Sequence, residues 1–447
     1  MEKKKKPSAK TLQTAQEAAY FGKKTLKNAL RAQEEGRPVA WSMVNQYCEM
    51  IPRAMGMELV FPENFGAFCA AVGTAEDYLE RSDAEGFPPT LCGYARNCFG
   101  YASVMAANDL RVPGDAPGGG MAKPAVFLSS GGVCDARFKW FQALGRYFDA
   151  PVWTIELPHT GTKEFFLPGY KDKTIAFLAR NLRSYVSFLE DLLGKKMDED
   201  TLSEHVDRAL KTLKVAYEID RLRRAVPSPM TGPDFWAIMM THYFMTDDPE
   251  VLPFTKKVYD EVKYRVDNGI AAIPNEKYRL MFQEIPPWHS LDFFGELAEE
   301  LGVNIVMESW SFHPPLPIPE EELEGVSDPI EILARLCYRK WMGYSDVGIK
   351  YGYEPSFYMA AWLQWVENYR ADGMMNHLLR SCRPATYTTL HTKNALMDVF
   401  KVPSIEIDGD IVDLRVFNKE EAFSKVEAFI ETMDHYREVR KKDGFDW

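Results

Sequence analysis

Long apolar runs are missing from this sequence. No segment approaches the ~18 consecutive apolar residues that a membrane-spanning helix needs. The first ten residues, MEKKKKPSAK, are basic, but they are not followed by the apolar stretch of roughly 7–15 residues that a secretory signal requires. We therefore expect a cytoplasmic protein with no membrane partner.

An excess of positive charge is missing as well. The 447 residues carry a formal net charge of -12, whereas affinity for nucleic acid depends largely on Lys and Arg side chains that neutralise phosphates. We expect no nucleic-acid partner. The chain is 46% hydrophobic and too long for one ordinary core, so two or more domains are expected.

Paired cysteines and a nucleotide-binding loop are also lacking. None of the seven cysteines forms a CxxC pair, and their spacing matches no compact zinc or ferredoxin pattern. Spacing alone favours reduced, buried thiols over a metal cluster, and Cys48, Cys69 and Cys337 have the apolar neighbours of core residues. No GxxxxGK(S/T) loop for a nucleotide is present.

The sequence does contain a regular alternation of strand-like and helix-like segments, as in PAVFLSSGGVCDARFKWFQALGRYFDAPVWTIELP. This alternation predicts an α/β fold whose parallel sheets are covered by helices. We predict a basic arm and an N-terminal helical element over 1–35, and a first doubly wound domain over 36–170. A helical bridge is predicted over 171–265, and a second doubly wound domain over 266–447.

Three further cysteines lie at the ends of predicted elements. Cys92 follows a Pro-Pro turn and precedes a helix-like stretch, which also contains Cys98. Cys134 lies where a strand-like run passes into a helix, and doubly wound sheets bind ligands at such points. Cys382 lies between two arginines where a strand or a helix ends. Helix starts and cationic neighbours stabilise a thiolate, which is the form that binds metal.

At these residues the sequence resembles the iron-sulfur catalytic subunits of the 2-hydroxyacyl-CoA dehydratase and ATP-dependent benzoyl-CoA reductase family. The resemblance extends from about Pro38 to about Met433. It rests on seven motifs in family order: WSMVNQYCE, FPENFGA, LCGYARNCFGYA, VCDARFKWFQALGRY, RLMFQEIPPW, DGMMNHLLRSCRP and VPSIEIDGDIVDLR.

The resemblance implies that Cys92, Cys134 and Cys382 bind a [4Fe-4S] cluster, with Cys98 as an alternate ligand. Thiolates suit iron-sulfur clusters, and three ligands leave one iron open to substrate. Because Cys382 belongs to the second predicted domain and the other two ligands to the first, the cluster is expected in the cleft between the domains.

The family also implies partners and a cellular setting. A homologous second catalytic subunit pairs with this one, and ATP is hydrolysed on a separate activator that carries its own iron-sulfur cluster and receives electrons indirectly from ferredoxin. The substrate is an acyl-CoA, and the setting is the cytoplasm of an anaerobic bacterium or archaeon.

Four polar residues are candidates for contact with the substrate. Glu63, just past a strand end, and His159, after the strand that follows Cys134, are the acid/base candidates; a helix N-terminal carboxylate and a solvated loop histidine are the alternative interpretations. Ser42 and Asn45 are candidates for binding the thioester or the acyl group, with a capping or turn role as the alternative.

Two reactions fit the family. In both, one electron enters a CoA thioester. We expect reduction of the aromatic ring of benzoyl-CoA to a dienoyl-CoA, because the chain length and the WSMVN and PHTG motifs resemble the larger reductase subunit. The alternative is elimination of water from an (R)-2-hydroxyacyl-CoA, and an electron-transfer protein without acyl-CoA chemistry is a third possibility.

Overall fold

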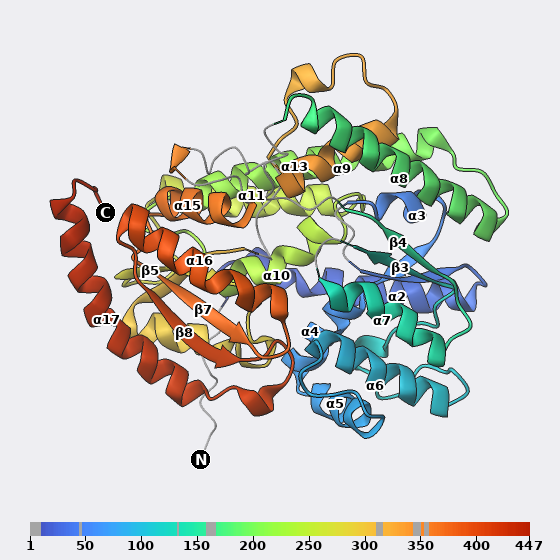
Figure 1. Ribbon diagram of the computed structural model, residues 1–447, viewed down its shortest axis with the longest axis horizontal. Coiled ribbons are helices and arrows are strands. Elements are labelled where there is room, and N and C mark those ends of the chain that lie inside the picture. Colours follow the sequence, from blue (N-terminus) through green and yellow to red (C-terminus); the bar gives the residue numbers. More distant parts are fainter. Residues whose placement is uncertain are drawn as a thin grey trace.

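The computed structural model describes residues 10–43, 47–131, 134–157, 167–309, 316–342, 350–352 and 357–447. Two four-stranded parallel sheets lie side by side with helices around them (Figure 1). The predicted α/β class with two parallel sheets is therefore confirmed, whereas the boundaries of the domains stay predictions. No helix in the described ranges combines the length and the apolar character needed to cross a bilayer.

The first sheet has the strand order β2-β1-β3-β4. Its strands are β1 (Val39–Ser42), β2 (Glu58–Val60), β3 (Val126–Ser130) and β4 (Val152–Ile155). Every residue of β1 and β3 is buried, as expected for central strands covered on both faces. The helix between β1 and β2 ends beside Gly56, whose φ of 77° lies in the left-handed region that favours glycine.

Short and medium helices surround this sheet. They are α1 (Gln13–Glu17), α2 (Ala19–Glu34), α3 (Met50–Ala54), α4 (Pro62–Val72), α5 (Ala75–Ala84), α6 (Gly93–Ala107) and α7 (Asp135–Ala143), with 3-10 turns η1 (Pro117–Gly119) and η2 (Leu144–Arg146). α2 packs against β1 and β2, and α7 packs against β3 and β4. Helices therefore pack against both the central and the edge strands of this sheet.

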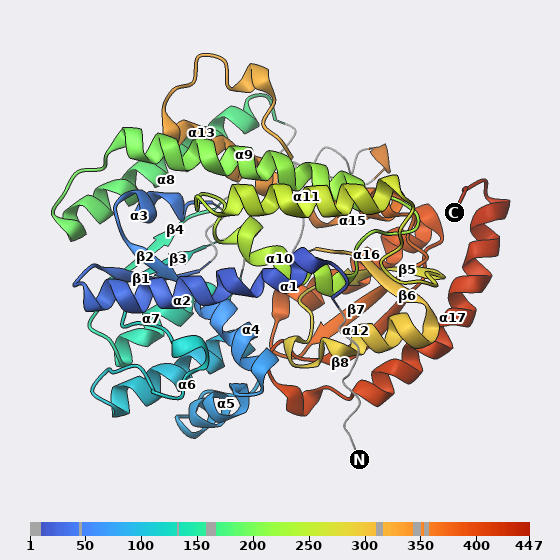
Figure 2. The same ribbon diagram turned by 180° about the vertical axis from the view of Figure 1, so that it is seen from behind.

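The segment after the first sheet is helical, as predicted. It contains α8 (Tyr170–Leu193), α9 (Glu199–Arg223), α10 (Gly232–Tyr243) and α11 (Val251–Asp267). Figure 2 shows α9 and α11 running along the upper side of the molecule, from the first sheet toward the second. α10 contacts both α2 and the strand β6 (Val303–Glu308) of the second sheet, so this helix links the two parts of the molecule.

The second sheet repeats the strand order of the first, as β6-β5-β7-β8. Its strands are β5 (Tyr278–Gln283), β6 (Val303–Glu308), β7 (Gly373–Leu379) and β8 (Ser404–Gly409). Around it lie α12 (Asp292–Glu296), α13 (Pro329–Met342), α15 (Phe357–Tyr369), α16 (Arg383–Phe400) and α17 (Lys419–Lys442), with η4 (Trp288–Ser290), η5 (Leu297–Leu301), η6 (Glu320–Glu322) and η7 (Leu414–Val416). The element before Cys382, which the sequence left open between strand and helix, is the strand β7.

Two of the cysteines lie at equivalent places in the two sheets. Cys134 follows β3, and Cys382 follows β7, which is the strand in the same place of the second sheet. In both sheets this strand lies beside the first strand of the sheet, so the connection direction reverses between the two strands. Open parallel sheets bind ligands at such reversals, beyond the carboxyl ends of the strands.

Candidate functional site

Three cysteines each stand directly before a helix. Cys92 precedes α6, Cys134 precedes α7 and Cys382 precedes α16. The Arg137 backbone N–H lies 3.4 Å from the Cys134 sulfur, and backbone N–H groups of the first helical turn also reach the other two sulfurs. Each sulfur therefore faces the positive end of a helix, which favours negative charge.

These three cysteines line one cavity, which encloses about 930 Å³ including its open mouth. Cys134 follows a strand of the first sheet and Cys382 follows a strand of the second, so the cavity lies between the two parts of the molecule. The remaining wall is mostly apolar or aromatic and includes Ala67, Tyr94, Ala136, Trp140, Met239, Tyr243, Phe244, Ile285, Trp288, Pro384 and Ile411.

The other cysteines have different surroundings. Cys98 is buried inside α6 and does not belong to the described lining of this cavity. Cys48 and Cys337 are buried with their sulfurs 3.7 Å apart, and Cys69 is buried on α4. The expectation that Cys48, Cys69 and Cys337 lie in the core is confirmed.

The chemistry of the three cavity thiols fits an iron-sulfur cluster. Burial, reinforced by the neighbouring Cys134, raises the pKa of Cys92 to about 12. Burial also raises the pKa values of Cys134 and Cys382. Without a bound cation these groups are neutral thiols, and iron would displace their protons on binding. Thiolates that accept backbone hydrogen bonds are the usual ligands of such clusters.

No three His, Cys, Asp or Glu side chains among the described residues converge on a position for a single metal ion.

One ion pair stands in the cavity wall. The Glu63 carboxylate, in the first turn of α4, accepts a hydrogen bond of 3.0 Å from the guanidinium of Arg137. Their side chains are 19% and 5% exposed, so the pair is largely shielded from water. Since Arg137 lies on the helix that Cys134 begins, Glu63 is held beside a candidate cluster ligand.

Of the other three sequence candidates, the structure describes Ser42 alone. Ser42 is buried at the carboxyl end of β1, and its hydroxyl donates a hydrogen bond of 2.8 Å to the Met43 carbonyl. It is absent from the described cavity lining. Asn45 and His159 lie outside the described residues, so their roles stay predictions.

Sequence reasoning missed several residues of the cavity wall. Arg137, Tyr94 and Trp288 lie within the motifs VCDARF, LCGYAR and EIPPW, yet no local pattern assigns them a function. In the structure the Trp288 indole N–H donates a hydrogen bond of 2.5 Å to the Tyr94 hydroxyl. This bond joins η4 to α6 and fixes two aromatic rings at the cavity wall.

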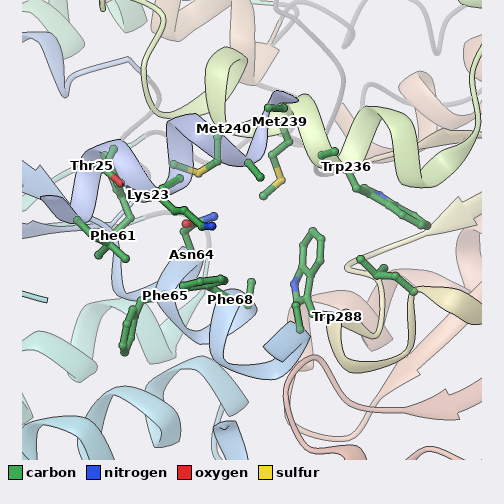
Figure 3. Close-up of a pocket in the computed structure, with 18 of the residues that line it drawn as sticks. Lys23, Thr25, Phe61, Asn64, Phe65, Phe68, Trp236, Met239, Met240 and Trp288 are labelled. Carbon is green, nitrogen blue, oxygen red and sulfur yellow. Dashed lines mark hydrogen bonds between the residues drawn. The ribbon is translucent and has the colours of Figure 1, made fainter. Parts of the chain in front are cut away.

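A second cavity, which Figure 3 shows, shares part of its lining with the first. It encloses about 1000 Å³ including its mouth, and the two cavities have four lining residues in common: Asn64, Ala67, Met239 and Trp288. Figure 3 shows Phe61, Phe65 and Phe68 on one side and Trp236, Met239 and Met240 on another. The second cavity is therefore a mainly apolar space beside the cysteines.

Known proteins match almost the whole chain. Residues 45–433 match the family described as "2-hydroxyglutaryl-CoA dehydratase, D-component". The (R)-phenyllactyl-CoA dehydratase alpha subunit of Clostridium sporogenes is 24% identical over 93% of both chains. The (R)-2-hydroxyglutaryl-CoA dehydratase subunit alpha of Acidaminococcus fermentans is 22% identical over 94% of this chain and 96% of that protein.

A reductase is also similar. A benzoyl-CoA reductase subunit of Thauera aromatica is 23% identical over 79% of this chain and 80% of that protein. The family match extends over most of the chain and includes Cys92, Cys134 and Cys382. The chain thus belongs to the 2-hydroxyglutaryl-CoA dehydratase D-component family, as its motifs indicated.

Proposed function

We propose that the chain is a catalytic subunit of an acyl-CoA enzyme and binds a [4Fe-4S] cluster through Cys92, Cys134 and Cys382. One observation carries the proposal: three thiols from distant parts of the chain, each at the start of a helix, line a single cavity. Named relatives that act on acyl-CoA thioesters support the class of substrate.

Elimination of water from an (R)-2-hydroxyacyl-CoA is the reaction we favour. The sequence motifs favoured ring reduction of benzoyl-CoA, but the dehydratase alpha subunits match 93–94% of this chain and the reductase subunit matches 79%. Ring reduction stays the second candidate, because an apolar and aromatic cavity wall also suits an aryl group.

The residues around the cavity have separable tasks. When bound, the cluster supplies a low-potential electron and an open iron site for the thioester or hydroxyl oxygen. Glu63 is a base or acid for a substrate proton, and Arg137 holds its carboxylate in one orientation. The apolar wall excludes water, which strengthens the electrostatic effect of both groups.

Partners complete the proposed enzyme. The relatives are named as subunits of dehydratases and of a reductase, so we propose a homologous second subunit. Because the sequence has no GxxxxGK(S/T) loop, we propose that ATP hydrolysis occurs on a separate activator, which carries an iron-sulfur cluster and is reduced indirectly by ferredoxin.

Product analysis tests the function. The chain, purified without oxygen together with its second subunit and activator, receives ATP, dithionite and either an (R)-2-hydroxyacyl-CoA or benzoyl-CoA. An enoyl-CoA from the first substrate supports dehydration, and a dienoyl-CoA from the second supports ring reduction. If neither product forms while the reductant keeps the activator reduced, both enzyme assignments are wrong.

Glu63 has a test of its own. We expect Glu63→Gln to lower kcat by about 10²–10⁴-fold, the usual contribution of a general acid or base, without loss of iron. Glu76→Gln is the matched control, since Glu76 is an exposed first-turn glutamate of α5. If Glu63 had only a structural role, through the helix dipole and the Arg137 ion pair, Glu63→Gln would lower stability and leave kcat unchanged.

A further inference from the structure

The second cavity is a candidate site for the CoA part of the substrate. We infer, on the basis of the proposed function, that the pantetheine arm of the substrate lies in the second cavity and that Lys23 at its mouth binds the phosphates of the CoA nucleotide. The thioester then reaches the cysteine cavity across the walls that the two cavities share, at Asn64 and Trp288.

The shape of the second cavity suits a long flexible arm. Its wall comes from α2, α4, α10 and η4, and it is mainly aromatic or aliphatic. An arm of methylene and amide groups gains free energy when its apolar parts leave water, but its amides need hydrogen-bonding partners. Ligand cavities commonly combine such a wall with a few polar groups.

Asn64 supplies one such polar group. Its side chain is half-buried, lines both cavities and makes no hydrogen bond with another described residue. A carboxamide can donate to a carbonyl and accept from an N–H, so it matches either amide of the pantetheine arm. Its position in α4, next to Glu63, places it where the arm would pass into the cysteine cavity.

Lys23 is the candidate for binding the phosphates. It is exposed on α2, lines the second cavity and makes no ion pair within the described part of the chain. The adjacent Lys24 differs, because its ammonium pairs with Asp248 at 2.8 Å and Glu250 at 3.2 Å. An unpaired ammonium at the mouth of an apolar cavity is suited to a phosphate.

The charge test compares two thioesters of the same acyl group. One is the CoA thioester, and the other is the N-acetylcysteamine thioester, which lacks the nucleotide and its phosphates. In the complete anaerobic enzyme, Lys23→Ala should raise KM for the CoA thioester about tenfold or more, as expected for one lost hydrogen bond to a charged group. The KM for the N-acetylcysteamine thioester should change less than about twofold.

Lys27 is the matched control for charge, since it is exposed on the same helix one turn further on and does not line the second cavity. Lys27→Ala should alter both KM values less than about twofold, because an exposed charge that makes no direct contact is screened. Equal effects of Lys23→Ala on both thioesters, or no effect on either, would overturn the inference.

A variant with a large side chain inside the second cavity tests directly whether the substrate binds there. An added Cβ at Gly22, in α2, meets no atom within 4 Å, and replacing a mid-helix glycine does not weaken helix formation. Gly22→Trp should therefore fold, retain its iron and raise KM for the CoA thioester at least about tenfold. Gly114→Trp, also open and outside the described lining of this cavity, should leave KM unchanged. Normal KM in Gly22→Trp would contradict the inference.

Binding of etheno-CoA, followed by fluorescence anisotropy in the same complex, separates this inference from the proposed function. If binding weakens in Lys23→Ala while no thioester is converted, the CoA site stands and the proposed reaction fails. If thioesters are converted normally and neither KM nor anisotropy responds to Lys23→Ala, the CoA site fails alone.

Discussion

Each candidate ligand of the cluster occupies the residue before a helix, and this position is the basis of a prediction at the residue scale. We expect Cys92→Ala, Cys134→Ala and Cys382→Ala each to lose most of the bound iron and sulfide, because a cubane with two protein thiolates is poorly held. Iron and sulfide analysis with EPR of the anaerobically purified complex measures the loss.

Cys98→Ala is the control, since Cys98 is buried in α6 outside the described cavity lining. This variant should retain the cluster. A full cluster signal in all three cavity variants would disprove the ligand assignment, and loss of iron in Cys98→Ala alone would make Cys98 the ligand in place of Cys92.

His377, on β7, should make the unfolding free energy depend on pH. Burial lowers its pKa to about 4, although its ring nitrogen Nδ1 lies 2.7 Å from the Ile285 carbonyl. The unfolded chain binds a proton to this histidine below about pH 6.5, but the folded chain does not until about pH 4. Stability therefore falls as the pH falls through this window, by about 1.4 kcal/mol per pH unit.

Urea unfolding between pH 7 and pH 4.5 measures this effect. His377→Gln should reduce the slope of unfolding free energy against pH by the amount for one proton, because glutamine does not titrate. His435→Gln, at an exposed histidine of the C-terminal helix α17, is the control variant. Identical slopes for the parent chain and His377→Gln would contradict the prediction.

At the scale of elements, α5 and α6 pack so closely that one glycine is required. A Cβ on Gly100 would lie 1.8 Å from the Tyr78 carbonyl oxygen, which is backbone and cannot move aside alone. Gly100→Ala should therefore force the helices apart and cost about 1–3 kcal/mol or more in unfolding free energy. Gly22→Ala, at an open position of α2, should be neutral or stabilising by up to about 1 kcal/mol.

Denaturant midpoints of both variants test this comparison. Because α6 begins at Cys92, a displaced α6 should also reduce the iron content of Gly100→Ala and leave that of Gly22→Ala unchanged. Equal midpoints would show that the two helices can separate without cost.

At the scale of the whole molecule, a buried arginine connects the two parts. Arg96, on α6, is 1% exposed and pairs with Asp83 at 2.6 Å and with Asp413, which follows β8, at 3.3 Å. Arg96→Met should destabilise the chain by about 2–4 kcal/mol, because it leaves the buried Asp413 carboxylate and the half-buried Asp83 carboxylate with fewer partners. Arg415→Met is the control, since Arg415 pairs with the same carboxylates but is 38% exposed.

An exposed pair contributes at most about 1 kcal/mol, so the control should unfold close to the parent chain. Urea denaturation followed by tryptophan fluorescence distinguishes the two variants. A small effect of Arg96→Met, equal to that of Arg415→Met, would mean that this ion-pair network does not hold the two parts of the chain together.

The sequence alone determined the alternation of strands and helices, the helical segment between two α/β regions, and the placement of Cys92 and Cys134 at helix starts. These features depend on local periodicity and on Pro and Gly turns, which neighbouring residues specify. The strand before Cys382 was less certain, because a short apolar run such as GMMNHLL fits either a strand or a buried helix.

Only the tertiary structure decided that the three cysteines line one cavity, that Arg137 pairs with Glu63, and that a second apolar cavity adjoins them at Trp288. Cys92 and Cys382 are 290 positions apart in the sequence, and no local pattern encodes a contact at that separation. Such contacts follow from how two sheets with the same strand order pack through their helices, which is a property of the whole chain.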